Sequence, residues 1–249
     1  MLPLEEKKAV VTGCATGIGQ GIAIGLAKAG AHVIALDIGD LEDTREKVMA
    51  AGGGCDCYQV DLSDSGAVYR VWEKLAAEAG AVDILFNNAG MQYRRTAFEY
   101  PEEMFDKVVA VNLKAAYLLS QRAAVHFRER GIRGKIINTA SLFTTFGGFE
   151  VSGYTCSKHG IMGMTKALSN EFAPYGICVN AIAPGYIQTE LTRAVWSDPL
   201  KRKPINERIP AGRWGRPEDF EGVAVFLASR ASDYITGVMI PVDGGYSVR

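Results

Sequence analysis

The chain has 249 residues with 27 basic and 28 acidic side chains, a formal net charge of −1 and 48% hydrophobic residues. This balance gives no global field that would attract nucleic acid or anionic lipid, and no apolar run approaches the roughly 18 residues of a membrane span, so neither partner is expected. The start, MLPLEEKKAVVTG, lacks the basic region and apolar core of a signal peptide, which favours a cytoplasmic protein.

Cysteine and histidine spacing gives no metal or disulfide signature. The five cysteines form no C-x-x-C pair, and His32, His126 and His159 are scattered along the chain. In a reducing compartment we interpret these residues as buried thiols and surface imidazoles, and we predict no metal site.

Short apolar segments alternate with longer helical patterns throughout. Most of the short segments are apolar without strict alternation, as expected for strands covered on both faces. Strands are predicted at residues 8–13, 31–37, 55–61, 82–88, 134–141, 177–184 and 238–245. Helices are predicted at residues 17–29, 41–51, 64–79, 101–130, 153–173 and 217–228. This order predicts an α/β fold in a single domain, 1–249: a Rossmann-like, doubly wound parallel sheet of about seven strands with helices on both faces.

A glycine-rich stretch, TGCATGIG at residues 12–19, connects the first strand to the first helix. Gly13 permits a tight turn, and Gly17 and Gly19 let the backbone approach a diphosphate at the helix N-terminus, where unpaired N–H groups attract anions. The spacing differs from G-x-G-x-x-G, and three glycines can also serve only to shape a turn. The position after the first strand favours dinucleotide binding.

Asp37 ends the second predicted strand, at the distance from the glycine turn where an acidic residue contacts a nucleotide ribose. Its carboxylate can hold both ribose hydroxyls and would repel a 2′-phosphate, and neither Thr16 nor Ile38 supplies a positive charge. The sequence therefore favours NAD over NADP. The alternative is a plain turn residue.

Tyr154 and Lys158 lie four positions apart in GYTCSKHG, residues 153–160, on a predicted helix. Residues at this spacing share a helix face with Cβ atoms roughly 5–6 Å apart. An ammonium this close favours the phenolate and would lower the phenol pKa from about 10 by roughly 2–3 units. Tyr154 is therefore a candidate general acid or base. Spacing alone also allows a half-exposed Tyr and an unrelated surface Lys.

Residues 185–214 have no clean period and contain Pro199, Pro204 and Pro210. A segment this long in a compact domain is usually functional or mobile. We interpret it as a substrate lid with one or two short helices.

Seven pieces of the sequence occur in a characteristic order. They are TGCATGIG, Asp61-Leu62, NNAG at residues 87–90, Asn112, Ser141, YTCSK at residues 154–158 and PGYIQT at residues 184–189. In these pieces and their order the chain resembles the short-chain dehydrogenases/reductases over essentially its whole length.

The resemblance implies a catalytic set of Asn112, Ser141, Tyr154 and Lys158. Tyr154 would exchange a proton with the substrate oxygen, and Lys158 would lower the tyrosine pKa and bind the nicotinamide ribose. Ser141 would hydrogen-bond the reacting group, and Asn112 would hold a water that links Lys158 to solvent.

The same resemblance assigns the remaining cofactor contacts. Asp61 and Leu62 would border the adenine, the NNAG segment would support the middle of the cofactor, and Ile187 and Thr189 would fix the carboxamide. With the glycine turn and Asp37, the predicted NAD-binding residues are Gly13, Thr16, Gly17, Ile18, Gly19, Asp37, Asp61, Leu62, Asn88, Ala89, Gly90, Tyr154, Lys158, Pro184, Gly185, Ile187 and Thr189.

Four segments resemble the sugar-acid dehydrogenases of the family: NNAGMQYRR, GGFEVSGYTCSK, RIPAGRWGRPEDF and ASDYITGVMIPVDGG. This implies a sugar-acid substrate oxidised or reduced at a secondary alcohol or ketone. Arginine pairs bidentately with carboxylate, so Arg94, Arg95 and Arg213 are candidates for the acid group. Surface charge explains Arg94 and Arg95 equally well, and a lid clamp or a subunit contact explains Arg213 equally well. The predicted substrate residues are Ser141, Tyr154, Arg94, Arg95, Gln92, Phe143 and Glu150.

Two rival functions stay open. A 3-oxoacyl thioester reductase has the same fold, but it normally uses NADPH and a basic surface for its carrier protein, which Asp37 and the neutral charge balance disfavour. A catalytically silent nucleotide-binding scaffold is a different class. The resemblance implies a homotetramer that pairs the long helices at residues 101–130 and 153–173 and docks the C-terminal segment. Apolar faces on both helices permit this arrangement, and a dimer stays open.

Overall fold

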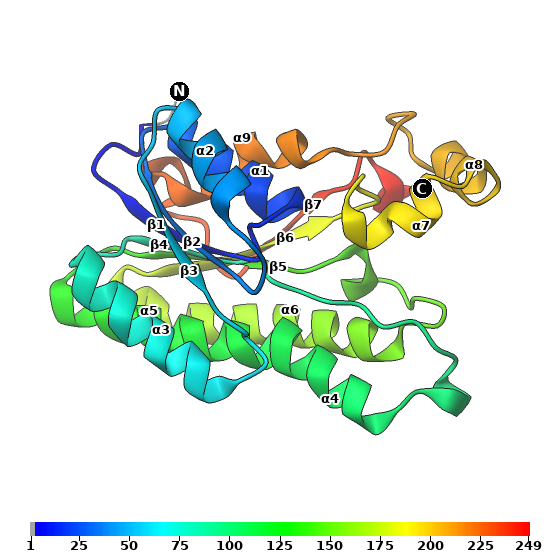
Figure 1. Cartoon of the computed structure of the whole chain (residues 1–249), viewed down its shortest axis with the longest axis horizontal. Helices are drawn as coiled ribbons and strands as arrows, with labels where there is room; N and C mark the ends of the chain where they lie inside the picture. Colours follow the sequence, from blue (N-terminus) through cyan, green and yellow to red (C-terminus); the bar gives the residue numbers. More distant parts are fainter. Residues whose placement is uncertain (1–2) are drawn as a thin grey trace.

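The computed structural model describes residues 3–249, in which one seven-stranded parallel sheet runs through the centre (Figure 1). The strand order is β3-β2-β1-β4-β5-β6-β7. Successive strands are therefore added toward one edge of the sheet from β1 to β3 and toward the other edge from β4 to β7. The strands are β1 (Lys8–Thr12), β2 (His32–Asp37), β3 (Cys55–Gln59), β4 (Ile84–Asn87), β5 (Lys135–Thr139), β6 (Cys178–Pro184) and β7 (Met239–Val242). Each strand lies within the segment predicted for it, and the predicted fold is confirmed.

Helices cover both faces of the sheet (Figure 1). One face carries α1 (Gly17–Lys28), α2 (Glu42–Ala50) and α9 (Glu221–Ala228). The other carries α3 (Ser65–Ala79), α5 (Ala115–Arg130) and α6 (Ser152–Phe172). Within residues 3–249, no helix combines the length and the apolarity that crossing a membrane requires.

The strands bury both of their faces, which explains why they are apolar without alternation. Val10 pairs with Ile34 on β2 and with Leu85 on β4, and all three belong to the core beneath α3, α5 and α6. Their neighbours in the chain belong to the core beneath α1 and α9: Val11, Ala35 and Phe86. A polar substitution in these central strands would therefore leave an unpaired group in one core or the other.

The predicted helix at residues 101–130 is interrupted, which corrects the sequence prediction. It consists of α4 (Glu102–Val109), one π-helical turn (Ala110–Lys114) and α5. A π turn admits one extra residue per turn and often occurs at functional sites. No glycine or proline occurs between residues 102 and 130, so the sequence gives no sign of the interruption.

The prediction of surface imidazoles and buried thiols is wrong at several positions. His126 is buried in α5, where its Nε2 accepts a 3.0 Å hydrogen bond from the backbone N–H of Val82 and its ring meets Trp72 edge-on. Burial lowers the pKa of His126. Cys57 and Cys156 are exposed. Cys57 lies on β3 at the edge of the sheet, and its edge position follows from strand order rather than from local sequence.

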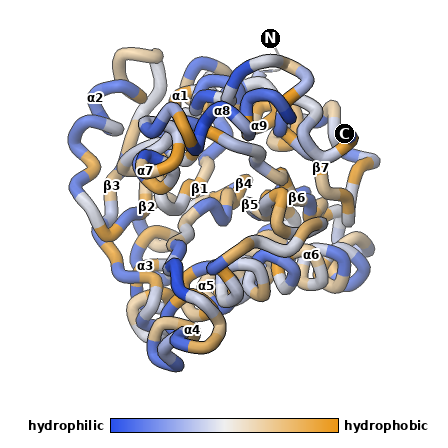
Figure 2. Tube along the Cα trace, turned by 90° about the vertical axis from the view of Figure 1, so that its right-hand side faces the viewer, coloured by the Kyte–Doolittle hydropathy of each residue, from blue (hydrophilic) through white to orange (hydrophobic). Residues whose placement is uncertain are grey.

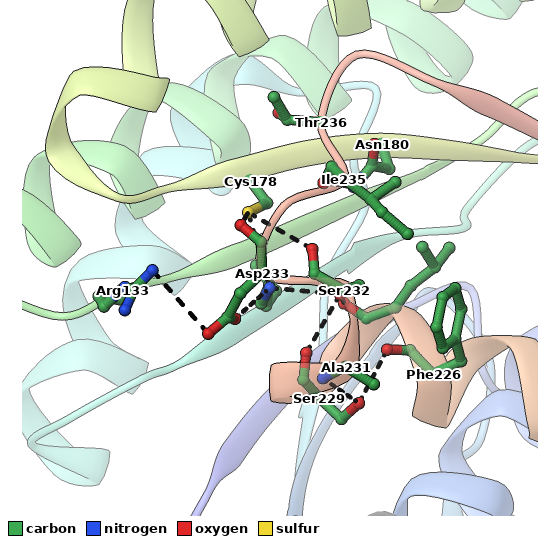
Figure 3. Close-up of polar contacts among 12 residues, drawn as sticks. Arg133, Cys178, Asn180, Phe226, Ser229, Ala231, Ser232, Asp233, Ile235 and Thr236 are labelled. Carbon is green, nitrogen blue, oxygen red and sulfur yellow. Dashed lines mark hydrogen bonds and ion pairs between the residues drawn. The ribbon is translucent and has the colours of Figure 1, made fainter.

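A polar cluster ties together the amino ends of β5 and β6 and the segment before β7 (Figure 3). Lys135, with a nearly buried side chain, donates to Asp233 at 2.8 Å and to the Ser232 hydroxyl at 3.2 Å. Arg133 lies 3.9 Å from the other oxygen of the same carboxylate. The hydrogen bond from Lys135 holds the pKa of Asp233 below its usual range. This cluster fastens the end of the sheet opposite to the one where the glycine turn lies.

Two short helices follow β6: α7 (Arg193–Trp196) and α8 (Pro199–Arg208). The Asp198 carboxylate accepts from the backbone N–H of Leu200 at 2.9 Å and caps α8, and Pro199 occupies the first turn, where no backbone donor is lost. Figure 2 shows α7 and α8 on one side of the strand ends and α4 on the other. One or two short helices were expected in residues 185–214, and the role of this segment as a substrate lid stays a prediction.

Candidate active site

The glycine turn between β1 and α1 is packed too closely for side chains. Gly13 and Gly17 have φ of +65° and +62°, and a Cβ on Gly13 would lie 2.6 Å from the Cα of Ala89. A Cβ on Gly19 would collide with the carbonyl oxygen of Gly13. The turn therefore requires glycine, and it brings bare backbone to the start of α1, where a phosphate binds well.

Asn88 and Thr12 hold this turn in place. The Asn88 side-chain amide donates to the carbonyl oxygens of Thr12 at 3.1 Å and Gly13 at 2.9 Å. The Thr12 hydroxyl accepts from the backbone N–H groups of Asn88 and Ala89, each at 3.0 Å. The NNAG segment therefore braces the glycine turn, a structural role that the sequence did not reveal.

Asp37 ends β2 beside the glycine turn. Its two carboxylate oxygens accept from the backbone N–H groups of Ala15 and Gly39, each at 2.9 Å. These bonds orient the carboxylate and leave lone pairs on both oxygens, since each oxygen accepts more than one hydrogen bond. Asp37 lines the main cavity next to Ile38, which carries no charge.

One cavity of about 520 Å³ brings the predicted cofactor and catalytic residues together. It runs from Asp37 past the glycine turn to the start of α6. Of the predicted residues it is lined by Gly13, Thr16, Gly17, Ile18, Asp37, Asp61, Leu62, Asn88, Ala89, Gly90, Ser141, Tyr154, Lys158, Pro184, Gly185, Ile187 and Thr189. Gly19 and Asn112 do not line this cavity. Ten further lining residues were not predicted: Ile38, Val60, Met91, Lys107, Val111, Thr139, Ala140, Glu190, Leu191 and Thr192.

Lys158 is buried at the floor of this cavity and reaches from α6 to the end of β5. Its ammonium donates to the carbonyl oxygen of Thr139 at 2.6 Å and lies 5.5 Å from the centre of the Tyr154 ring. Burial lowers the pKa of Lys158 to about 8. Ser141 begins the short 3₁₀ turn after β5, and its hydroxyl accepts from the backbone N–H of Phe143 at 3.2 Å.

The predicted fall in the pKa of Tyr154 is wrong in this structure. Burial raises the pKa of the phenol, and the neighbouring Ser141 hydroxyl acts in the opposite direction without reversing it. The prediction counted only attraction to Lys158, whereas taking the phenolate out of water also costs free energy. Tyr154 is therefore a neutral phenol at neutral pH in this arrangement.

Asn112 occupies the π turn and is almost fully buried. Its Oδ1 accepts from the Met91 N–H at 2.8 Å, and its Nδ2 donates to the Met91 carbonyl at 3.0 Å and to the Ser157 hydroxyl at 3.0 Å. A Cβ added to Gly90 would lie 3.5 Å from the Asn112 oxygen and 3.7 Å from the Lys158 nitrogen, so all three residues meet. Ser157, whose role the sequence did not reveal, ties α6 to the π turn.

The predicted substrate residues lie around the catalytic end but do not line the main cavity, apart from Ser141 and Tyr154. Phe143 meets the Tyr154 ring edge-on with centroids 6.1 Å apart. The Arg95 N–H donates to the Glu150 carbonyl oxygen at 2.9 Å, which joins the loop after β4 to the loop before α6. Arg94 is exposed and Gln92 is half-buried.

Arg213 is not available for a substrate carboxylate in this structure. Its guanidinium donates to both oxygens of Asp219, at 2.7 Å each. The bidentate pair fastens the end of residues 185–214 to the turn before α9. Of the roles that the sequence left open for Arg213, the clamp is the one that the geometry favours.

Comparison with known proteins identifies the family. A profile of the family described as Enoyl-(Acyl carrier protein) reductase matches residues 13–247. A 2-dehydro-3-deoxy-D-gluconate 5-dehydrogenase from Dickeya dadantii (strain 3937) is 47% identical over 246 residues, which cover 99% of this chain and 97% of the relative. The chain belongs to the short-chain dehydrogenase/reductase family. It is therefore an oxidoreductase, as the resemblance implied.

Solved short-chain dehydrogenase/reductase structures share the whole fold. A candidate NAD(P) dependent gluconate 5-dehydrogenase from Beutenbergia cavernae with bound NADP has a TM-score of 0.95 and 42% identity, and the match covers 99% of each chain. A gluconate 5-dehydrogenase from Burkholderia cenocepacia J2315 in complex with NADP and tartrate has a TM-score of 0.93 and 34% identity, covering 99% of this chain and 97% of that one.

Proposed function

We propose that this short-chain dehydrogenase/reductase uses NAD to transfer a hydride to or from a secondary alcohol or ketone of a sugar acid. The substrate is of the 2-dehydro-3-deoxy-D-gluconate or 2-deoxy-D-gluconate type. The observation that carries the proposal is that Ser141, Tyr154 and Lys158 line the same cavity as Gly13 and Asp37. The substrate class rests on relatives named 2-dehydro-3-deoxy-D-gluconate 5-dehydrogenase, 46–47% identical over 99% of the chain.

The cavity fits a dinucleotide along its length. The bare glycine turn receives the diphosphate, Asp37 and Asp61 lie toward the adenosine end, and Pro184, Ile187 and Thr189 lie toward the nicotinamide end. Asn88 contributes indirectly, because its amide fixes the carbonyl oxygens of the glycine turn. The bound cofactor supplies or accepts the hydride.

Tyr154 moves the proton that accompanies the hydride. Because burial raises its pKa, the phenol is protonated at neutral pH and can donate to the oxygen of a ketone that is being reduced. Ser141 holds the same oxygen. The buried ammonium of Lys158 stabilises the phenolate that remains, and in the oxidative direction this phenolate takes the proton back. Asn112 shapes the floor of the site beneath Lys158.

The negative charge of Asp37 supports the choice of NAD over NADP. The Asp37 carboxylate is held by two backbone donors and would meet a 2′-phosphate with like charge. Two of the solved relatives contain bound NADP, so the ratio of kcat/KM with NAD to that with NADP is the measurement that tests this choice.

Gluconate 5-dehydrogenase activity is the alternative within the same substrate class. It is favoured by the solved structures that carry this name and by a 5-keto-D-gluconate 5-reductase from Escherichia coli (strain K12) that is 37% identical over 250 residues. The identity to the 2-dehydro-3-deoxy-D-gluconate enzymes is higher, so we place gluconate second.

Residues 185–214 form the proposed substrate lid. They include α7 and α8, and the Arg213 clamp to Asp219 closes their far end. We also propose a homotetramer in which α4, α5 and α6 pair between subunits. Each of these two helices carries an exposed ring, Phe105 on α4 and Tyr117 on α5, that pairing between subunits would bury.

A substrate panel tests the function. Wild-type protein is assayed with NAD and NADP against 2-dehydro-3-deoxy-D-gluconate, 2-deoxy-D-gluconate, D-gluconate and neutral polyols in oxidation. It is assayed with NADH and NADPH against 5-keto-D-gluconate and 3-oxoacyl thioesters in reduction. The proposal expects the highest kcat/KM for the deoxygluconate type with the NAD pair. Turnover of 3-oxoacyl thioesters alone would assign the rival reductase, and no turnover with cofactor binding retained would assign the silent scaffold.

A further inference from the structure

A cationic and aromatic cluster lies beside the catalytic end, and Arg94 is its only member that the sequence predicted to contact substrate. It comprises Tyr186 after β6, Arg208 at the end of α8, Tyr246 near the C-terminus, Phe146 before α6 and Arg94 after β4. The Tyr186 and Tyr246 rings have centroids 5.0 Å apart, and the Arg208 guanidinium lies 4.3 Å from the centre of the Tyr246 ring and 5.6 Å from that of Phe146.

The two arginines of this cluster have no acidic partner. The ion pairs of residues 3–249 include neither Arg94 nor Arg208. Asp243, an acid of the nearby C-terminal segment, is turned to backbone N–H groups instead and accepts from Gly245 and Ser247 at 2.9 Å each. The charge of this cluster is therefore positive and uncompensated within the described part of the chain.

The guanidinium of Arg208 is held in place by its aromatic neighbours and by the C-terminal segment. Arg249 donates to the Glu207 carbonyl oxygen at 2.8 Å, and the Ala211 N–H donates to the Gly244 carbonyl oxygen at 3.0 Å, so the end of α8 and the C-terminus form one unit. A guanidinium stacked on a ring keeps its N–H edge free, and that edge matches a carboxylate bidentately.

Short stretches of chain connect the cluster to residues of the catalytic end. Phe143 meets Tyr154 edge-on, and Phe146 follows three residues later under Arg208. Tyr186 directly follows Gly185, which lines the main cavity. Both Arg94 and Arg208 are near enough to lower the pKa of Tyr186, although burial and Tyr246 outweigh them and raise it to about 12.

We propose that Arg208, together with Arg94, binds the carboxylate of the substrate while the opposite end of the substrate reacts at Tyr154. This assignment rests on the proposed sugar-acid activity and deepens it, since it makes a residue of the lid helix α8 the one that recognises the acid group. It also explains how the lid would respond to substrate, because a carboxylate bound by both arginines bridges α8 to the loop after β4 and holds the lid over the site.

Steady-state kinetics of Arg208→Gln and Arg208→Lys test the assignment, each with a sugar acid and with the neutral polyol or ketose of equal length. Loss of a charge-assisted, bidentate contact is expected to raise KM for the acid about 10- to 100-fold in Arg208→Gln while kcat stays within about twofold. Arg208→Lys keeps the charge and should recover part of the loss. KM for the neutral compound and the affinity for NADH should not change.

Lys203→Gln on α8 is the matched control, because it removes the same charge from the exposed surface of the same helix and should leave both KM values unchanged. An equal rise in KM for the acid and the neutral compound, or no rise for the acid, overturns the carboxylate assignment. If wild type turns over only neutral compounds, the proposed function fails instead. If it turns over none, titration of the NADH complex with D-gluconate decides, and equal affinity of wild type and Arg208→Gln would refute the subsite.

Discussion

The ammonium of Lys158 on α6 donates a hydrogen bond to the main-chain carbonyl oxygen of Thr139 at the end of β5, at 2.6 Å. Helical spacing places Lys158 beneath Tyr154, and this bond fixes which way the lysine points. Strand β5 thus supplies the hydrogen-bond acceptor that orients the Lys158 side chain, which helical spacing alone does not do. As a result the buried cation lies at the floor of the cavity, 5.5 Å from the centre of the Tyr154 ring.

Replacing Lys158 by Met should change how stability depends on pH. Burial lowers the pKa of Lys158 from 10.5 to about 8, so below pH 8 the folded protein carries the full cost of a buried charge. Between these two values the folded state has released the proton that the unfolded state still holds, and the contribution of this group to stability rises with pH.

The measurement is the free energy of unfolding from urea denaturation at several pH values, taken as the difference between wild type and Lys158→Met. This difference should shift in favour of wild type by up to about 3 kcal/mol from pH 8 to pH 10.5, and it should be flat below pH 8. Parallel pH curves for the two proteins would show that the lysine is not desolvated.

Asp37→Ser should relax the choice of cofactor. Removing the carboxylate removes both the ribose hydroxyl acceptor and the repulsion of a 2′-phosphate, so the ratio of kcat/KM with NAD to that with NADP should fall by about tenfold or more. Asp40→Ser is the matched control, because Asp40 is exposed and its side chain only accepts from the Glu42 N–H. A wild-type enzyme that already prefers NADP tenfold contradicts the role given to Asp37.

Asn112→Ala and Ser157→Ala separate the bonds of the π turn. Asn112→Ala leaves both backbone groups of Met91 without their partner, and we expect a loss of about 2–3 kcal/mol of unfolding free energy together with reduced activity. Ser157→Ala leaves both Met91 bonds intact. It removes one of the three Asn112 bonds and the bond from the Ser157 hydroxyl to the Tyr154 carbonyl oxygen, and it should cost about 1–2 kcal/mol. Equal costs for the two variants in chemical denaturation would contradict the larger contribution given to the Met91 contacts.

Gly19→Ala should abolish cofactor binding or folding, because its Cβ would collide with the carbonyl oxygen of Gly13 and the Asn88 amide. Gly222→Ala in α9 is the contrasting substitution, since a Cβ there meets nothing within 4 Å. A helical Gly→Ala change in open space should stabilise by roughly 0.5–1 kcal/mol. NADH fluorescence titration and thermal melting distinguish the two, and normal NADH affinity in Gly19→Ala would mean that the turn is looser than described.

Strands, helices and the cofactor cavity were predictable because each depends on local pattern. Strand runs, the glycines before α1 and the four-residue spacing of Tyr154 and Lys158 are all local, and the parallel sheet brings the carboxyl ends of its strands to one edge. The predicted catalytic residues Ser141, Tyr154 and Lys158 come from the turn after β5 and from α6, which are consecutive in the chain.

The remaining features depend on contacts between segments far apart in the sequence. The π turn follows from bonds between Asn112 and Met91, and the burial of His126 follows from the packing of α5 against Trp72. The sequence analysis did not single out Arg208, because its contact with the Tyr246 ring depends on where the C-terminal segment lies. The predicted pKa of Tyr154 was wrong because burial does not follow from helical spacing.

Tyr154→Phe, compared with wild type in the same NAD-linked assay, tests the central claim most directly, with NADH titration as the check that the cavity is intact. If Tyr154 carries the proton, kcat with the preferred sugar acid should fall by about 10²- to 10⁴-fold while the affinity for NADH is unchanged. Turnover by Tyr154→Phe at the wild-type rate would contradict the account, because the phenol would then have no part in the reaction.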